Sequence, residues 1–277
     1  MAVEENQVLP GRALPFADEC RWLISLDYDE TLRSCDALQP VPLEFFELMR
    51  QWRHLGVRWG INTGRTLPYL CGELLPCSPF LPDFICTCER FVYVSREDGV
   101  VHPLLEHNKR CHEHNMQVRH RLQPLFHAQL AELRRRQPSL AWIIAETDPL
   151  SVEAENSATM DAIMAFLAPF VTEQQGVSAQ RAGRYMRLAD ARYSKGTALQ
   201  TVARLWQVPS SRWVMLGDGH NDMHAFRLFP EAFCGAPATA HPEVLEYLQS
   251  RGSYISSTEG VMEILHAWHA SVMTERG

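Results

Sequence analysis

One short stretch, W-L-I-S-L-D-Y-D-E-T-L at Trp22–Leu32, constrains the fold more than any other part of the chain. Four of its first five residues are apolar, which is typical of a strand buried on both faces of a parallel sheet. Asp27 and Asp29 follow directly, and the carboxyl ends of strands are where open α/β sheets bind ligands. Two such carboxylates repel each other unless a cation such as Mg²⁺ lies between them. The stretch therefore predicts either a magnesium site or an ordinary polar turn.

A second strand of the same sheet is predicted after a helix. Apolar residues recur at helical spacing over residues 45–55, Gly56 is a suitable helix stop, and Val57–Asn62 alternates like a strand. A strand, a helix and a strand in succession predict a βαβ unit, in which the two strands are parallel. Their carboxyl ends then meet at one edge of the sheet.

The turn Thr63-Gly64-Arg65 follows the second strand and is expected at the same edge as Asp27. A hydroxyl, a closely approachable backbone and a guanidinium together suit a bound phosphate group. Small turn residues after a strand are common, so the triplet alone is equally compatible with a structural turn.

A third group of polar residues lies in the last third of the chain. Lys195 opens a predicted helix, and the short apolar strand Trp213–Leu216 runs into G-D-G-H-N-D, which contains Asp218, Asn221 and Asp222. A further helix is expected to begin near Asn221 or Asp222, both of which are acceptable N-caps. Acidic and phosphate-binding groups thus recur at the ends of separate predicted strands.

The length of 277 residues favours two domains or one domain with a large insertion. Residues 1–78 and 190–277 share the strand–helix alternation and are expected to form a Rossmann-like parallel-sheet core. Residues 79–189 differ in texture, with short strands expected at 84–88, 91–95 and 100–101 and a helix at 107–136 divided by Pro124. We therefore predict an α/β fold with an inserted α+β cap domain.

Composition excludes several classes of function. The net charge of −7 argues against nucleic-acid binding, which needs a basic face. No apolar run approaches the ~20 residues of a membrane span. The first nine residues lack a basic-then-apolar signal pattern, so we expect a cytoplasmic protein that does not contact membranes. The sequence does not determine the oligomeric state.

The four motifs together resemble the haloacid dehalogenase-like superfamily of phosphohydrolases. The resemblance rests on Asp27 and Asp29 in D-Y-D-E-T, on Thr63 in T-G-R, on Lys195, and on the G-D-G-H-N-D run. The insert lies between the second and third motifs, which is the position of the large type-2 cap in this superfamily. Its α+β texture is similar to the sucrose-phosphate phosphatase and Cof-type branch.

The resemblance implies a role for each matching residue. Asp27 would be the nucleophile that forms an aspartyl-phosphate, and Asp29 the acid that protonates the leaving group and then activates water. Mg²⁺ would be held by Asp27, Asp218 and Asp222 and by the backbone carbonyl of Asp29. The phosphoryl oxygens would be bound by the following residues: Thr63, Gly64, Arg65, Lys195 and Asn221.

The resemblance thus implies an Mg²⁺-dependent phosphatase whose partner is a small phosphorylated substrate. Polar, charged turns in the insert favour a sugar phosphate over a lipid, and Glu89, Arg90, Arg184 and Arg187 are candidates to read the leaving group. Two alternatives remain open at this point. One is a sugar phosphomutase with the same intermediate, and the other is a non-catalytic phosphate-binding or regulatory protein.

Overall fold

The computed structural model describes residues 9–10, 19–33, 41–74, 76–145, 148–258 and 260–274. These residues fall into two compact units, one within Lys109–Ser194 and one within Glu4–Asn108 and Lys195–Gly277. We call them the smaller and the larger unit. No described helix is both long and apolar enough to cross a membrane.

The larger unit is built on a nine-stranded sheet with the order β1-β6-β5-β4-β3-β2-β11-β12-β13. Strands β4, β3, β2, β11, β12 and β13 run parallel to one another, whereas the pairs β4–β5, β5–β6 and β6–β1 are antiparallel. The strand bounds are β1 Leu9–Pro10, β2 Trp22–Leu26, β3 Val57–Asn62, β4 Phe84–Thr87, β5 Phe91–Ser95, β6 Val100–Pro103, β11 Trp213–Leu216, β12 Phe233–Ala236 and β13 Tyr254–Ile255. The predicted α/β fold with a parallel-sheet core is confirmed.

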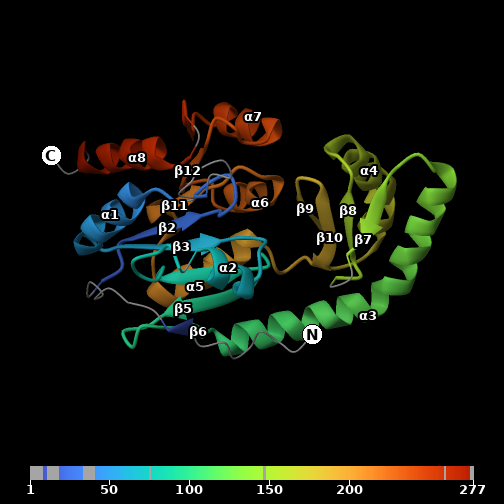
Figure 1. Ribbon diagram of the computed structural model, residues 1–277, viewed down its shortest axis with the longest axis horizontal. Helices are drawn as coiled ribbons and strands as arrows, with labels where there is room; N and C mark the ends of the chain where they lie inside the picture. The colour runs from blue at the N-terminus through green and yellow to red at the C-terminus, as the bar shows by residue number, and fades with distance from the viewer. Residues whose placement is uncertain are drawn as a thin grey trace. The chain divides into compact units, whose positions relative to one another are not determined.

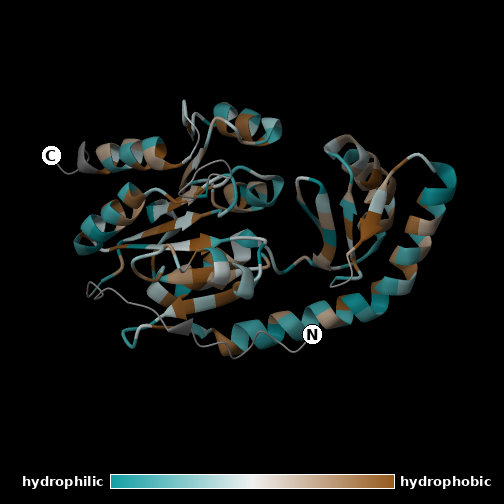
Figure 2. Ribbon diagram, in the orientation of Figure 1, coloured by the Kyte–Doolittle hydropathy of each residue, from teal (hydrophilic) through white to brown (hydrophobic). Residues whose placement is uncertain are grey.

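Helices cover both faces of this sheet (Figure 1). Ile24 and Leu26 of β2 pack on one face in a core that includes Phe45 and Trp268, whereas Leu23 packs on the other face with Leu199 and Phe226. The central strands are accordingly hydrophobic in Figure 2. The helices of this unit are α1 Leu43–Trp52, η2 Arg53–Leu55, α2 Leu67–Glu73, α5 Lys195–Trp206, η3 Ser210–Arg212, α6 His220–Leu228, α7 Pro242–Ser250 and α8 Met262–Thr274.

The smaller unit combines helices with a four-stranded antiparallel sheet of order β7-β8-β10-β9. Its elements are α3 Leu105–Arg136, β7 Trp142–Ile144, β8 Ser151–Ala154, α4 Ser157–Glu173, β9 Val177–Ala182 and β10 Tyr185–Asp190. Helix α3 begins in the larger unit and continues into the smaller one. Pro124 was expected to divide this helix, but α3 continues through it. Leu122 and Phe126, on either side of Pro124, are buried in the same core and hold the two halves together.

The boundary of the insert also differs from the expected one at residue 79. Strands β4, β5 and β6 extend the core sheet, and the smaller unit begins only at Lys109. The short apolar run of β4 is buried because it pairs in parallel with β3. A Cβ on Gly60 would lie 2.2 Å from the carbonyl oxygen of Phe84, so a glycine in β3 permits this close pairing.

Candidate active site

Four neighbouring strands of the core sheet deliver the candidate site residues to one edge. Asp27 follows β2, Thr63 follows β3, Glu89 follows β4 and Asp218 follows β11, and the sheet order is β4-β3-β2-β11. The N–H of Asp27 donates to the carbonyl of Leu216 (2.9 Å), which fixes the end of β2 beside the end of β11. Parallel pairing therefore places residues that are far apart in the sequence around one point.

Three carboxylates converge at this point. One oxygen each of Asp27, Asp218 and Asp222 lies within 4.8 Å of the others. The Tyr28 N–H donates to Asp27 Oδ1 (2.7 Å), and the Thr31 hydroxyl donates to Asp218 Oδ1 (2.8 Å). A backbone N–H thus holds the carboxylate of Asp27, and a side-chain hydroxyl holds that of Asp218.

Lys195 is the cation of the site and is almost completely buried. Its Nζ lies 2.9 Å from Asp27 Oδ1 and 2.8 Å from Asp222 Oδ1. Burial alone lowers the pKa of Lys195, but the carboxylates of Asp222 and Asp27 outweigh burial and raise the pKa above its ordinary value. Lys195 is therefore charged, and it stabilises the carboxylate of Asp27.

One lysine does not compensate the charge of three carboxylates. Burial first, and then the nearby charges of Asp27 and Asp222, raise the pKa of Asp218 to about 8. Burial likewise raises the pKa of Asp222 to about 7, against the lowering effect of Lys195. These raised values are the electrostatic signature of a site that gains from a further cation, and an all-oxygen donor set fits a hard divalent ion such as Mg²⁺.

Helix α6 positions Asp222. The helix begins at His220 with Gly219 as its N-cap, and Asp222 Oδ2 accepts the Gly219 N–H (3.1 Å). The helix thus begins slightly before the expected start at Asn221 or Asp222, because the carboxylate of Asp222 caps the helix from its third position. A Cβ on Gly217 would lie 2.2 Å from Asp222 Cγ, so only glycine leaves room for this carboxylate.

Asp29 lies apart from this group and pairs with arginines. Arg65 Nε lies 2.7 Å from Asp29 Oδ2, and Arg33 Nη1 lies 3.4 Å from Asp29 Oδ1. Arg65 also stacks over the ring of Tyr69, with 4.6 Å from its Cζ to the ring centroid. The guanidinium expected to bind phosphate is thus engaged with the candidate acid–base residue. The expected metal contact through the Asp29 backbone carbonyl stays a prediction.

The structure also places Thr63, Gly64 and Asn221 near one another. The Thr63 hydroxyl accepts the N–H of Arg65 (3.1 Å), and a Cβ on Gly64 would lie 3.4 Å from Glu89 Oε1. Asn221 Nδ2 donates to Glu89 Oε1 (2.8 Å). This contact orients Asn221, whose expected role in binding a phosphoryl oxygen stays a prediction.

The sequence motifs did not predict that Glu89 and Asn62 belong to the site. Glu89 was expected to read the substrate from the cap, but it is buried in the larger unit, where its N–H donates to the Thr63 carbonyl (2.9 Å). Asn62 Nδ2 donates to the carbonyl of Lys195 (2.9 Å) and so fixes the first residue of α5. Its position directly before Thr63 at the end of a predicted strand was the available signal.

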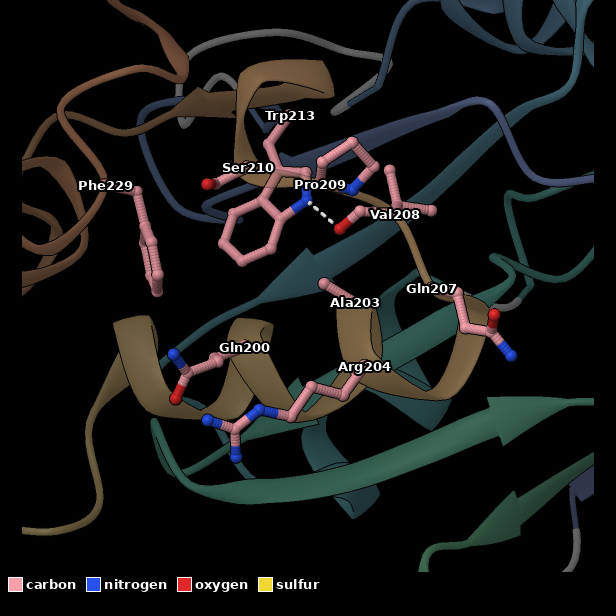
Figure 3. Close-up of a pocket in the computed structure, with 9 residues that line it drawn as sticks. All are labelled: Gln200, Ala203, Arg204, Gln207, Val208, Pro209, Ser210, Trp213 and Phe229. Atoms are coloured by element: carbon pink, nitrogen blue, oxygen red, sulfur yellow. Dashed lines mark hydrogen bonds between the residues drawn. The ribbon is translucent and has the colours of Figure 1, made fainter.

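A separate pocket of about 430 Å³ lies elsewhere on the larger unit (Figure 3). Trp213 and Phe229 form its aromatic wall, and Trp213 Nε1 donates to the carbonyl of Val208 (3.0 Å). Trp213 is the first residue of β11, whereas Asp218 follows the other end of that strand. The pocket contains none of the candidate carboxylates and is therefore not the catalytic site.

Comparison with known proteins agrees with this arrangement. A family model described as haloacid dehalogenase-like hydrolase matches residues 87–265, more than half of the chain. Among curated proteins, none matches the sequence significantly.

Solved structures similar to this one include the sucrose-phosphatase of Synechocystis sp. PCC6803 in complex with sucrose and phosphate. It is 19% identical, with 90% of this chain and 96% of that chain covered and a TM-score of 0.68. The haloacid dehalogenase-like hydrolase protein yhjK of Bacillus subtilis is 13% identical, with 92% and 93% covered and a TM-score of 0.59. Another haloacid dehalogenase-like hydrolase of B. subtilis is 16% identical, with 84% and 94% covered and a TM-score of 0.52. At these identities the likeness is one of fold.

Proposed function

The chain belongs to the haloacid dehalogenase-like hydrolases, and from this premise and the geometry of the site we propose that it is an Mg²⁺-dependent phosphomonoesterase acting on a sugar phosphate. The observation that carries the proposal is the buried Lys195, which contacts both Asp27 and Asp222 beside Asp218. A nucleophile, a fixed positive charge and a divalent-metal donor set thus meet within one cluster. Phosphoryl transfer depends mainly on such positioning and charge stabilisation.

The proposed reaction begins at Asp27. One oxygen of its carboxylate attacks the phosphorus atom, and the bond between phosphorus and the leaving oxygen breaks, which gives an aspartyl-phosphate. The ammonium of Lys195 and the hydroxyl of Thr63 stabilise the charge on the phosphoryl oxygens. A divalent ion held by Asp27, Asp218 and Asp222 would supply Lewis-acid stabilisation of the same oxygens.

We assign the proton transfers to Asp29. Its carboxyl would protonate the leaving alkoxide and then, as a carboxylate, remove a proton from the water that hydrolyses the aspartyl-phosphate. The ion pair with Arg65 orients this side chain independently of the metal-binding group. A protein that only binds phosphate does not need a general acid–base residue. The presence of Asp29 therefore favours an enzyme over the non-catalytic alternative.

We propose that the smaller unit is the cap that reads the leaving group. In the sequence it is inserted between the Thr63 turn and Lys195, which is the position of the type-2 cap. The fold similarity to a sucrose-phosphatase solved with sucrose and phosphate supports a sugar phosphate as the substrate class. The alternative of a sugar phosphomutase shares the intermediate and differs in its product.

The test is the hydrolysis of p-nitrophenyl phosphate by the full-length protein. We expect phosphate release that requires Mg²⁺, stops with EDTA and returns when Mg²⁺ is added in excess. Asp27→Asn, which keeps the size of the side chain, should fold normally and lose about 10³-fold or more in kcat. Comparable turnover in this variant would overturn the nucleophile assignment, and absence of turnover in the Mg²⁺-loaded wild type would overturn the proposed activity.

A further inference from the structure

A second group of potential metal ligands lies beside the catalytic carboxylates. Among the described residues, one side-chain atom each of His220, His241 and Glu243 lies within 4.8 Å of the others. We propose that these three residues form a second metal site, distinct from the Asp27 group, which binds a borderline transition ion of the Zn²⁺ type.

The site is formed where two helices begin. His220 is the first residue of α6, His241 is the N-cap of α7, and Glu243 lies in the first turn of α7. Helices α6 and α7 are neighbours in the larger unit (Figure 1). The N–H of His241 donates to the carbonyl of Asp218 (2.8 Å), which fixes the start of α7 against the loop that leads into α6. The backbone thus holds the ligands from two sides.

The imidazole rings are close enough to share one ion. The ring centroids of His220 and His241 lie 3.7 Å apart with an interplanar angle of 52°. Nε2 of His220 lies 3.7 Å from Glu243 Oε2. Both rings and the carboxylate therefore lie within reach of a single ion.

The donor set separates this site from the catalytic one. Two imidazole nitrogens and one carboxylate are a set that Zn²⁺ uses, with water as the fourth tetrahedral ligand, whereas Mg²⁺ prefers oxygen ligands alone. Ligand atoms around a tetrahedral Zn²⁺ lie about 3.4 Å apart, so atoms that lie within 4.8 Å of one another need to close by at most about 1.4 Å. Glu243 can make this movement, because its side chain is 66% exposed, and the same exposure leaves a path for the ion to enter.

For His241, binding would give up a weak contact. The Glu243 N–H lies 3.4 Å from His241 Nδ1, at the long limit of a hydrogen bond, and this contact can be given up when the imidazole rotates toward a metal. The backbone hydrogen bond from His241 to Asp218 does not involve the imidazole ring, so it would persist when a metal binds.

The experiment measures Zn²⁺ binding to the full-length protein by calorimetry, with Mg²⁺ in large excess to occupy the all-oxygen site. We expect one bound Zn²⁺, and a Co²⁺-loaded protein with the strong visible absorption of a tetrahedral site. Glu243→Gln and His241→Gln should each weaken Zn²⁺ binding at least about 10-fold. His266→Gln is the matched control. His266 pairs with Glu44 (3.4 Å) but belongs to no group of three potential ligands among the described residues, so this variant should bind Zn²⁺ like the wild type.

Three results would overturn the proposal. One is unchanged Zn²⁺ affinity in the His220→Gln/His241→Gln double variant, with circular dichroism confirming that it folds. Another is loss of Zn²⁺ binding in Asp218→Asn with full binding in Glu243→Gln, which would assign the ion to the catalytic carboxylates. The third is loss of binding in Cys77→Ser, since Cys77 is an exposed free thiol.

Discussion

At the scale of single residues, the candidate catalytic cluster depends on space as well as charge. Asp222 contacts Lys195 and caps α6 at the same time, and it does so in the room that Gly217 leaves open. The neutral side chains of Asn62 and Thr31 donate two hydrogen bonds that fix the backbone of Lys195 and the carboxylate of Asp218. The ionic groups are therefore held by small and neutral residues around them.

Replacing Gly217 tests this dependence. In Gly217→Ala the new methyl group would overlap Asp222, so the carboxylate must leave its contact with Lys195. We expect kcat/KM for p-nitrophenyl phosphate to fall about 10- to 100-fold, together with weaker Mg²⁺ activation. Gly72→Ala is the matched control, because nothing lies within 4 Å of a Cβ at that position. Equal activity of the two variants would show that Asp222 does not need its observed position.

Replacing Arg65 tests whether it acts through Asp29. We expect Arg65→Met to lower kcat about 10-fold, because Asp29 loses the partner that orients it. In an Asp29→Asn background the same substitution should have little further effect, since residues that act as one unit are not additive. Additive losses in this double-mutant cycle would instead indicate that Arg65 binds the substrate directly.

At the scale of elements, the sequence predicted the parallel strands β2, β3 and β11 and the helices α1 and α6, which follow β2 and β11, but not α2, which follows β3. Their apolar runs and stop residues are local signals, and Gly56 does end η2 in the left-handed region, at φ 80°. The placement of β4–β6 was not predictable, because short strands around a turn look alike in a core sheet and in an insert. For the same reason Glu89, which follows β4, was assigned to the wrong unit.

A buried ion pair links two of these elements. Arg53 of η2 lies 2.8 Å from Asp83, the residue before β4, and Asp83 also accepts the Trp59 N–H of β3 (3.0 Å). In Arg53→Met the carboxylate loses its counter-charge, and we expect the free energy of unfolding to fall by about 3–5 kcal/mol. Urea unfolding measures this loss, and Arg53→Met/Asp83→Asn should recover part of it. A loss below about 1 kcal/mol would contradict this role.

The same pair predicts a pH dependence of stability. Burial raises the pKa of Asp83 despite the lowering effect of Arg53, so the folded chain holds this proton to higher pH than the unfolded chain does. The contribution of Asp83 to stability therefore decreases as pH rises above its unfolded pKa. Without Arg53 the pKa of Asp83 rises further, so the difference in unfolding free energy between wild type and Arg53→Met should grow as the pH rises through the folded pKa. A difference that shrinks with rising pH would contradict this prediction.

At the scale of the whole molecule, one edge of the core sheet carries the candidate site, and a separate unit is inserted into the chain between the second and third motifs. The residues of the larger unit account for the proposed phosphoryl transfer on their own. The proposal assigns substrate selection to the inserted unit, and local sequence signals do not predict this selection because it would depend on tertiary contacts with the substrate.

A panel of phosphorylated compounds tests the proposed substrate class. With Mg²⁺, we expect kcat/KM to be highest among sucrose, trehalose, mannosyl and simple hexose phosphates, and lower for p-nitrophenyl phosphate and for phospholipid headgroup esters. Free phosphate should appear in step with the dephosphorylated sugar. Isomerised sugar phosphate without net phosphate release would instead identify a phosphomutase.

The most direct test of the central claim is to locate the phosphoryl group on the protein during turnover. The reaction is quenched in acid, and the peptides are mapped by mass spectrometry. We predict one added phosphoryl group on Asp27 in the wild type, more of it in Asp29→Asn, where water is no longer activated, and none in Asp27→Asn. A phosphoryl group on another residue, or full turnover with none on Asp27 in any variant, would contradict the account.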